Sequence, residues 1–409
     1  MSAIPSRAHA HGPAVWAARE ATGRMVARLS RYSGDIALAE DAFATALLAA
    51  IEQWPTRGVP DDPEGWLYTV ARRSLVGQWR RADVRRRKAR ALAALHELAG
   101  EAARGEDPEW PDERLPLLFV CAHPAIAPSV RAPLMLQTVL GMTAEQIGPL
   151  MGLAPKSLGQ RLWRAKAKIR EARVPFAIPD PSQLASRSQA VLDAVYGLYA
   201  AGWADPRAEG LAEEAVWLAE VVAGLLDNLP EAHGLCALLL YVEARRSEGR
   251  RAGRYVPLDE QDPAAWNPDT IAKADQHLGF AHGLGVIGPF QLEAAIQSAL
   301  VHGHREGKVD HAAVLTLYDG LVDRAPTLGL FVGRAAAIAE HHGAAAGLEA
   351  LDALQGFEHF QPYWAVRASL LSRLGDPRTD ETYARAEALT GDPAVLAWLQ
   401  RQRSRASVN

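Results

Sequence analysis

The sequence predicts an all-α protein. Strong helix formers, chiefly Ala, Leu, Arg and Glu, dominate the 409 residues, whereas runs of β-branched residues are scarce. The interruptions fall at clusters of proline and glycine. Hydrophobic residues make up 49% of the chain, enough for a normal core, and the length suits roughly two to four domains.

Cysteine usage and hydropathy restrict the class of protein further. The chain has two cysteines, Cys121 and Cys236, which excludes a disulfide framework and fits a reducing compartment. The N-terminus lacks a basic segment followed by an apolar run, and no apolar stretch of about 18 residues occurs. We therefore expect a cytoplasmic protein with no membrane partner.

The sequence of the N-terminal quarter predicts three helices. Residues 14–54 form two of them, with a break near Tyr32–Asp35. Residues 54–63 contain three prolines and are expected to be a loop. The third helix starts at Pro63 with Asp62 as its N-cap, passes Arg81 and is expected to extend toward residue 90.

The sequence of the remaining chain predicts further helices, which are expected to form separate domains. The expected domains are 13–90, a linker over 91–111, a second helical unit over 112–173 and a C-terminal region of stacked helices over 180–409. In the C-terminal region, Pro326 and Pro393 each follow an amphipathic helix and lie 67 residues apart. This spacing is close to twice the roughly 34-residue tetratricopeptide period, which favours a tetratricopeptide-like array. The alternative is another antiparallel array of helices, which would show similar punctuation.

Charge is distributed unevenly along the chain. The net charge of −4 divides into about +7 over residues 1–175, with 25 Lys and Arg against 18 Asp and Glu, and −11 over the remainder. Such an asymmetry indicates a nucleic-acid partner for the basic part. The alternative is that a soluble acidic domain produces it by chance.

Residues 142–173 carry the helix-turn-helix pattern. Thr143 and Gln146 have the spacing of a capping box at the start of a short helix, and Gly152 closes that helix. Pro155 then occupies the first position of a longer second helix. A helix, a tight turn and a longer helix are typical of proteins that read the DNA major groove.

The second helix has two distinct faces. Its apolar residues at helical spacing are expected to face the core, and they are Leu158, Leu162, Ala165 and Ile169. Its polar residues are expected to meet DNA bases and phosphates, and they are Lys156, Ser157, Gln160, Arg161, Arg164 and Lys168. The alternative is an ordinary solvated basic face on a core helix.

A second basic segment spans residues 72–90. It holds nine cations and one anion, more than solubility needs, and the aromatic residues Trp66, Tyr68 and Trp79 accompany it. Cations beside aromatic rings suit a nucleic-acid strand with unstacked bases. For any one of these aromatic residues, a place in the core is the simpler interpretation.

These segments resemble a known family in their order along the chain. Residues 35–43, Trp54-Pro55 and residues 63–72 resemble sigma region 2, and residues 118–126 with the helix-turn-helix and residues 161–170 resemble sigma region 4. The match is to extracytoplasmic-function sigma factors with a long tetratricopeptide-like extension. That extension is resembled by residues 260–262, 288–296, 317–319 and 343–348.

The resemblance implies roles for particular residues. Asp35, Glu40 and Asp41 would bind the β′ clamp helices of core RNA polymerase, with the β flap as a further polymerase contact. The −10 promoter element would be met by Trp66, Arg72, Arg73, Trp79, Arg80 and Arg81. The six polar residues of the second helix would read the −35 element. The C-terminal extension would regulate activity, with an unidentified ligand or protein as a further partner.

Some residues depart from this pattern and leave other functions open. Gly77 and Gly159 lie inside predicted helices, and Pro133 and Pro149 fall where a helix would lose a hydrogen bond. A sigma-like scaffold that has become an enzyme or a binding protein is the alternative. The histidine pairs 302/304 and 341/342 lack a convincing third ligand, so we expect no metal, no cofactor and no catalytic residue.

Overall fold

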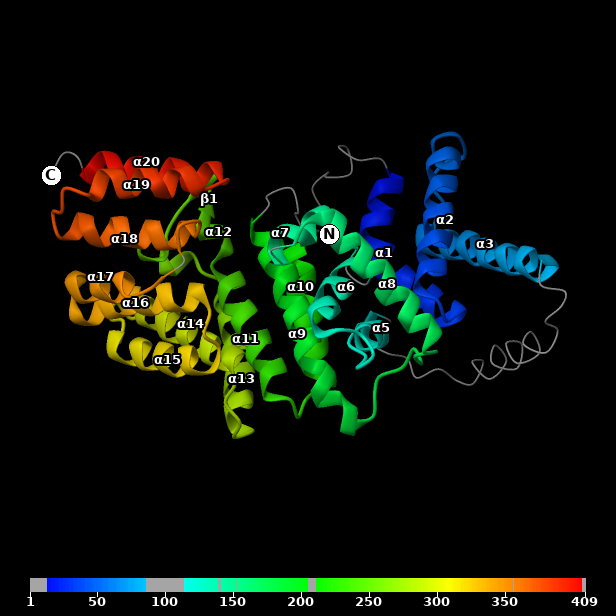
Figure 1. The fold of residues 1–409 in the computed structure, drawn as a ribbon, viewed down its shortest axis with the longest axis horizontal. Coiled ribbons are helices and arrows are strands. Elements are labelled where there is room, and N and C mark those ends of the chain that lie inside the picture. The colour runs from blue at the N-terminus through cyan, green and yellow to red at the C-terminus, as the bar shows by residue number, and fades with distance from the viewer. Residues whose placement is uncertain are drawn as a thin grey trace. The chain divides into compact units, whose positions relative to one another are not determined.

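The computed structural model describes residues 13–85, 114–138, 141–151, 153–204, 211–355 and 357–406. The chain forms two compact units, Met1–Ala201 and Gly202–Asn409, and each is described by itself. Helices account for nearly all of the described residues (Figure 1), which confirms the predicted all-α fold.

A short β-hairpin is the one sheet within the described ranges. Its strands are β1 (Arg250–Arg251) and β2 (Arg254–Tyr255), paired antiparallel. The turn residues Ala252 and Gly253 both have positive φ, 52° and 74°, as the tightest hairpin turns require. The sequence did not predict it, because two-residue strands are too short to show alternation.

The first three helices form a bundle. They are α1 (Pro13–Ser33), α2 (Ile36–Arg57) and α3 (Pro63–Arg85), and each packs against the other two. Asp35 caps α2 by accepting hydrogen bonds from the backbone N–H groups of residues 37 and 38. Asp62 accepts from the N–H of Gly65 at 2.9 Å. The predicted break near residue 34 and the predicted cap of α3 are both confirmed.

The predicted loop begins four residues later than expected and covers residues 58–62. Helix α2 continues through Pro55 to Arg57. Trp54 is only 5% exposed and packs edge-on against Trp66 at 5.5 Å between ring centroids. Burial of the Trp54 ring outweighs the loss of the one backbone hydrogen bond that Pro55 cannot donate.

Five helices are described in the second half of the N-terminal unit. They are α5 (Arg114–Cys121), α6 (Pro128–Thr138), α7 (Ala144–Met151), α8 (Pro155–Glu171) and α9 (Pro181–Ala204). Pro133 lies within α6 and Pro149 within α7, and both helices continue past their proline. The predicted closing residue Gly152 and the whole of the predicted linker over 91–111 lie outside the described residues.

Helix α9 belongs to the N-terminal unit along nearly all of its length. The guanidinium of Arg187 is buried and donates to the carbonyl oxygen of Phe119 at 3.3 Å. Farther along α9, a Cβ atom placed on Gly197 would lie 3.7 Å from Leu136. The compact unit thus continues past residue 180, where the prolines suggested the C-terminal region would begin.

The C-terminal unit is a succession of helices. They are α10 (Leu211–Leu225), α11 (Pro230–Ala244), α12 (Arg246–Gly249), two 3-10 turns (Leu258–Glu260 and Pro263–Ala265), α13 (Pro268–Gly283), α14 (Pro289–Arg305), α15 (His311–Arg324), α16 (Leu328–His342), α17 (Ala344–Asp352), α18 (Gln361–Arg373), α19 (Thr379–Leu389) and α20 (Pro393–Ala406). From α14 onward each helix packs against the next (Figure 1). Both prolines of the predicted repeat precede or open a helix, α16 and α20, and the tetratricopeptide-like assignment stays a prediction.

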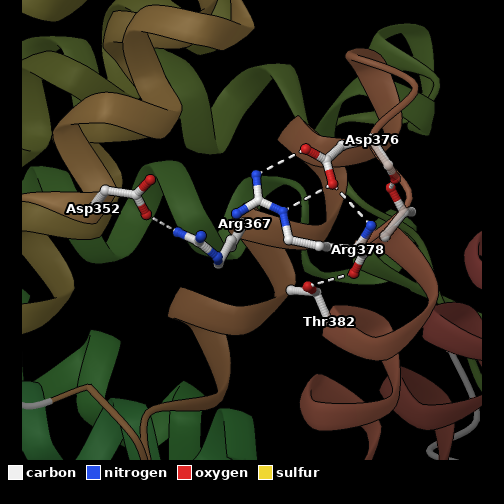
Figure 2. Close-up of polar contacts among 6 residues, drawn as sticks. Asp352, Arg367, Asp376, Arg378 and Thr382 are labelled. Carbon is white, nitrogen blue, oxygen red and sulfur yellow. Dashed lines mark hydrogen bonds and ion pairs between the residues drawn. The ribbon is translucent and has the colours of Figure 1, made fainter.

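A polar network ties the last of these helices together. Arg367 on α18 pairs with Asp352 on α17, while Arg378 pairs with Asp376 in the turn before α19 (Figure 2). The Thr382 hydroxyl donates to the carbonyl oxygen of Arg378 at 2.7 Å. Hydrogen bonds from Arg378 lower the pKa of Asp376 to about 2, so this network persists over the physiological pH range.

Glu293 on α14 lies in an apolar setting beside another acid. Glu231 on α11 accepts hydrogen bonds from the backbone N–H groups of Phe290 and Gln291, at 2.9 and 3.1 Å, and so caps α14. Burial, followed by the charge of Glu231, raises the pKa of Glu293 to about 7. A raised carboxyl pKa means that the folded unit favours the protonated form.

Replacing Glu293 with Gln is expected to remove part of the pH dependence of stability. The contribution of Glu293 is fully present below its unfolded pKa and is lost as pH rises through about 7. The variant should match the parent near pH 4 and exceed it near pH 8, by about 1–3 kcal/mol. Urea unfolding at both pH values checks this, with the exposed Glu349→Gln as the control. Equal stability of parent and variant near pH 8 would refute it.

Candidate nucleic-acid and polymerase interface

Helices α7 and α8 lie on either side of a short turn, at the place where the sequence predicts a helix-turn-helix. The N–H of Leu153 donates to the carbonyl oxygen of Gly148 at 2.9 Å, which turns the chain between the helices. A Cβ atom on Gly148 would lie 2.7 Å from the carbonyl oxygen of Leu153, so only glycine allows this close approach. Pro155 then opens α8 at its first turn, as predicted.

The two predicted faces of α8 are separated as expected. The four apolar residues of the core face are at most 7% exposed, and they are Leu158, Leu162, Ala165 and Ile169. The six predicted DNA-contacting residues are all exposed, and they are Lys156, Ser157, Gln160, Arg161, Arg164 and Lys168. The core face anchors the helix, and the opposite side presents four cations together to solvent.

On α3, the predicted −10 residues occupy different environments. Trp66 is half-buried against Trp54, which gives it a part in the core of the bundle. Trp79 is 37% exposed and stacks on Tyr32 of α1, with ring centroids 5.4 Å apart. Arg72 lies 5.0 Å from the centroid of the same tyrosine ring. Trp79, Tyr32 and Arg72 therefore form one exposed aromatic and cationic cluster.

The cluster includes residues that the sequence did not identify. Tyr32 joins it from α1, and beside it Arg28 lies 4.1 Å above the ring of Tyr68. These contacts join α1 to α3 across more than 35 positions of sequence, so no local spacing could reveal them. Arg73 is exposed on α3, and the side chains of Arg80 and Arg81 lie outside the described residues.

The three predicted polymerase-binding acids of α2 differ in accessibility. Asp41 is exposed. Asp35 is only 5% exposed, caps α2, and also pairs with Arg170 at 3.4 Å. Glu40 is held by Lys166 of α8, whose Nζ lies 2.7 Å from both carboxylate oxygens. Asp41 is thus the most accessible of the three.

The pair between Glu40 and Lys166 joins α2 to α8. The side chain of Lys166 is 11% exposed and that of Glu40 30%. Burial raises the pKa of Glu40, and the Lys166 charge and hydrogen bond oppose that rise. Loss of Lys166 would leave a largely buried carboxylate without its cation, which is costly.

Lys166→Ala is expected to destabilise the packing of α8 on α2 by about 1–3 kcal/mol. This value is at the low end of the range for buried ion pairs because Glu40 is partly exposed. Hydrogen exchange of peptides from both helices in the full chain measures this locally. Lys168→Ala, an exposed lysine two positions away, is the control and should change little. Adding Glu40→Gln to Lys166→Ala should recover part of the loss. Protection that is the same in all variants would mean that the pair does not hold the helices together.

Two of the paired histidines, His302 and His304, have structural partners. His302 Nε2 lies 2.8 Å from a carboxylate oxygen of Asp275, to which the buried Tyr241 hydroxyl also donates. The ring of His304 packs edge-on against Trp266. Across the described ranges, no three His, Cys, Asp or Glu side chains gather closely enough to hold a metal ion. No described helix is both long and apolar enough to cross a membrane.

Comparisons with known proteins match two parts of the chain to families. Residues 18–85 match the sigma-70 region 2 family, and residues 187–282 match a family of unknown function, DUF6596. An uncharacterised protein of Rhizobium meliloti (strain 1021) is 31% identical over 385 residues, which cover 91% of each chain. No solved structure matches.

The region 2 match covers α1, α2 and α3, which carry Tyr32, Asp41, Arg72 and Trp79. A sigma-70 region 2 implies interaction with core RNA polymerase and promoter DNA in general. Similarity over nine-tenths of both chains places this protein and the R. meliloti protein together. The chain therefore belongs to the same family as that protein, and it is a sigma-factor-like protein in which a sigma-70 region 2 precedes a DUF6596 domain.

Proposed function

We propose that the chain is a sigma factor of the extracytoplasmic-function type. It binds core RNA polymerase in the cytoplasm, directs it to promoters and needs no cofactor. In this proposal α2 binds the β′ clamp helices, α3 captures the −10 element and α8 reads the −35 element in the major groove. The C-terminal unit, a tetratricopeptide-like array, regulates this activity.

The observation that carries the proposal is the clean division of α8. A solvated core helix needs polar residues outside, but it does not need four cations on a helix that follows a tight turn and a shorter helix. Lys156 and Gln160 lie toward its N-terminal end, where base edges are read. Arg164 and Lys168 lie farther along, where phosphates are neutralised.

The cluster on α1 and α3 supports the −10 role. Trp79 and Tyr32 are exposed aromatic rings, and Arg72 lies beside them. Rings hold unstacked bases and cations hold phosphates, the combination that a melted strand requires. Asp41 is positioned to meet polymerase directly, whereas Glu40 would first have to leave Lys166.

Gel filtration with core polymerase tests the polymerase-binding part of the proposal. We expect the full chain to co-elute with core polymerase, and Asp41→Arg to weaken that association through charge reversal. Glu52→Arg reverses an exposed charge on the same helix outside the predicted set and should have no effect. A full chain that never associates with core polymerase argues against the proposal and for a sigma-like scaffold with another use.

A further inference from the structure

Trp163 stands out on the exposed side of α8. It is 71% exposed, the highest value among the large apolar side chains of the described residues. A single exposed apolar residue is common on protein surfaces and would need no explanation elsewhere. Here the ring lies among the predicted DNA-contacting residues, and it lines a shallow depression with Lys156, Gly159, Gln160 and Arg164.

Gly159 opens this depression. A Cβ atom at this position would meet nothing within 4 Å, so no internal contact of the described chain requires glycine there. Glycine inside a helix costs about 1 kcal/mol relative to alanine. Side chains on a helix lean toward its N-terminus, so Trp163 leans over the turn that contains Gly159. A larger residue at 159 would fill the space that the ring borders.

The surroundings of the depression indicate its occupant. Five cations of α8 are exposed, and the one acid of the helix, Glu171, lies at its far end. A polyanion therefore fits this surface better than an apolar or basic protein partner. In the major groove, the apolar feature that one base pair presents is the C5-methyl group of thymine.

We propose that Trp163 and the open surface over Gly159 form a receptor for the C5-methyl group of one thymine in the bound duplex. The inference rests on the proposed function, since it requires α8 to enter the major groove. It adds an apolar determinant of DNA sequence to the hydrogen-bonding residues of α8. It also gives Gly159 a function that outweighs its cost to helix stability.

Removing the thymine methyl groups of the duplex one at a time tests this proposal. Duplexes that the chain and core polymerase enrich from a random pool provide the binding site, and each thymine is then replaced singly by deoxyuridine. At one position within the α8 contact, the change should weaken binding about fourfold, the effect of burying one methyl group. Trp163→Ala and Gly159→Leu should each abolish that difference, while Trp217→Ala, another exposed tryptophan, should retain it.

Each outcome has a definite meaning. Gly159→Leu introduces a better helix former where nothing crowds a new side chain, so misfolding would not explain its effect. If enriched duplexes bind equally well with every thymine replaced, the methyl receptor is refuted while the proposed function stands. If no duplex is enriched at all, the proposed function fails and the receptor fails with it.

Discussion

Replacing Arg161 and Arg164 together with alanine is expected to weaken promoter binding by the complex with core polymerase on the order of 100-fold. Both guanidinium groups are exposed on the outer face of α8. An arginine on a base edge contributes about 1–3 kcal/mol, and one on a phosphate contributes through release of counterions. Because neither residue contacts the core face of α8, the fold should survive the change.

The salt dependence of binding identifies the cause of that loss. Removing the one phosphate contact of the pair should reduce the slope of log K against log salt by about 1. The matched control is Arg254→Ala with Arg401→Ala, two exposed arginines of the C-terminal unit, which removes the same charge. If the α8 variant binds promoter DNA with unchanged affinity and slope, α8 is not the recognition helix.

The second large effect concerns where the N-terminal unit ends. A chain that stops at residue 178 lacks α9, whereas a chain that stops at Ala204 retains it. We expect the shorter chain to lose cooperative unfolding. Helix α9 supplies the buried Arg187 and four apolar side chains that are at most 1% exposed, namely Val191, Leu192, Val195 and Leu198. Each contributes about 1.5–3 kcal/mol, so together they approach the stability of a domain.

Thermal unfolding followed by circular dichroism compares the two truncated chains. The chain ending at Ala204 should show one sharp transition, and the chain ending at 178 a broad or absent one. Arg187→Ala in the longer chain should lower its Tm, because it leaves the carbonyl oxygen of Phe119 without that hydrogen bond. Identical transitions for both truncated chains would show that α9 contributes nothing to the N-terminal unit.

The sequence predicts helix ends and helix faces well because both depend on local spacing. Asp62 and Pro63 mark the start of α3, and Pro155 that of α8. Leu158 and Ile169 lie on the same buried stripe of α8 because a helix turns once every 3.6 residues. The exposed face follows from the same periodicity, so the predicted α8 contact residues could be placed from the sequence.

Contacts between distant segments could not be predicted in this way. The pairing of Lys166 with Glu40 spans 126 positions, and nothing near either residue indicates the other. The stacking of Tyr32 on Trp79 is of the same kind. Trp54 shows the reverse case, in which tertiary burial extends a helix through the proline that local preference would use to end it.

Run-off transcription with purified core polymerase tests the central claim most directly. The template carries a duplex enriched by the complex, and the chain is supplied either at full length or ending at Ala204. We expect a discrete transcript with at least one of the two, and its loss with Arg161→Ala and Arg164→Ala in the same chain. Core polymerase that produces no specific transcript with either form would contradict it.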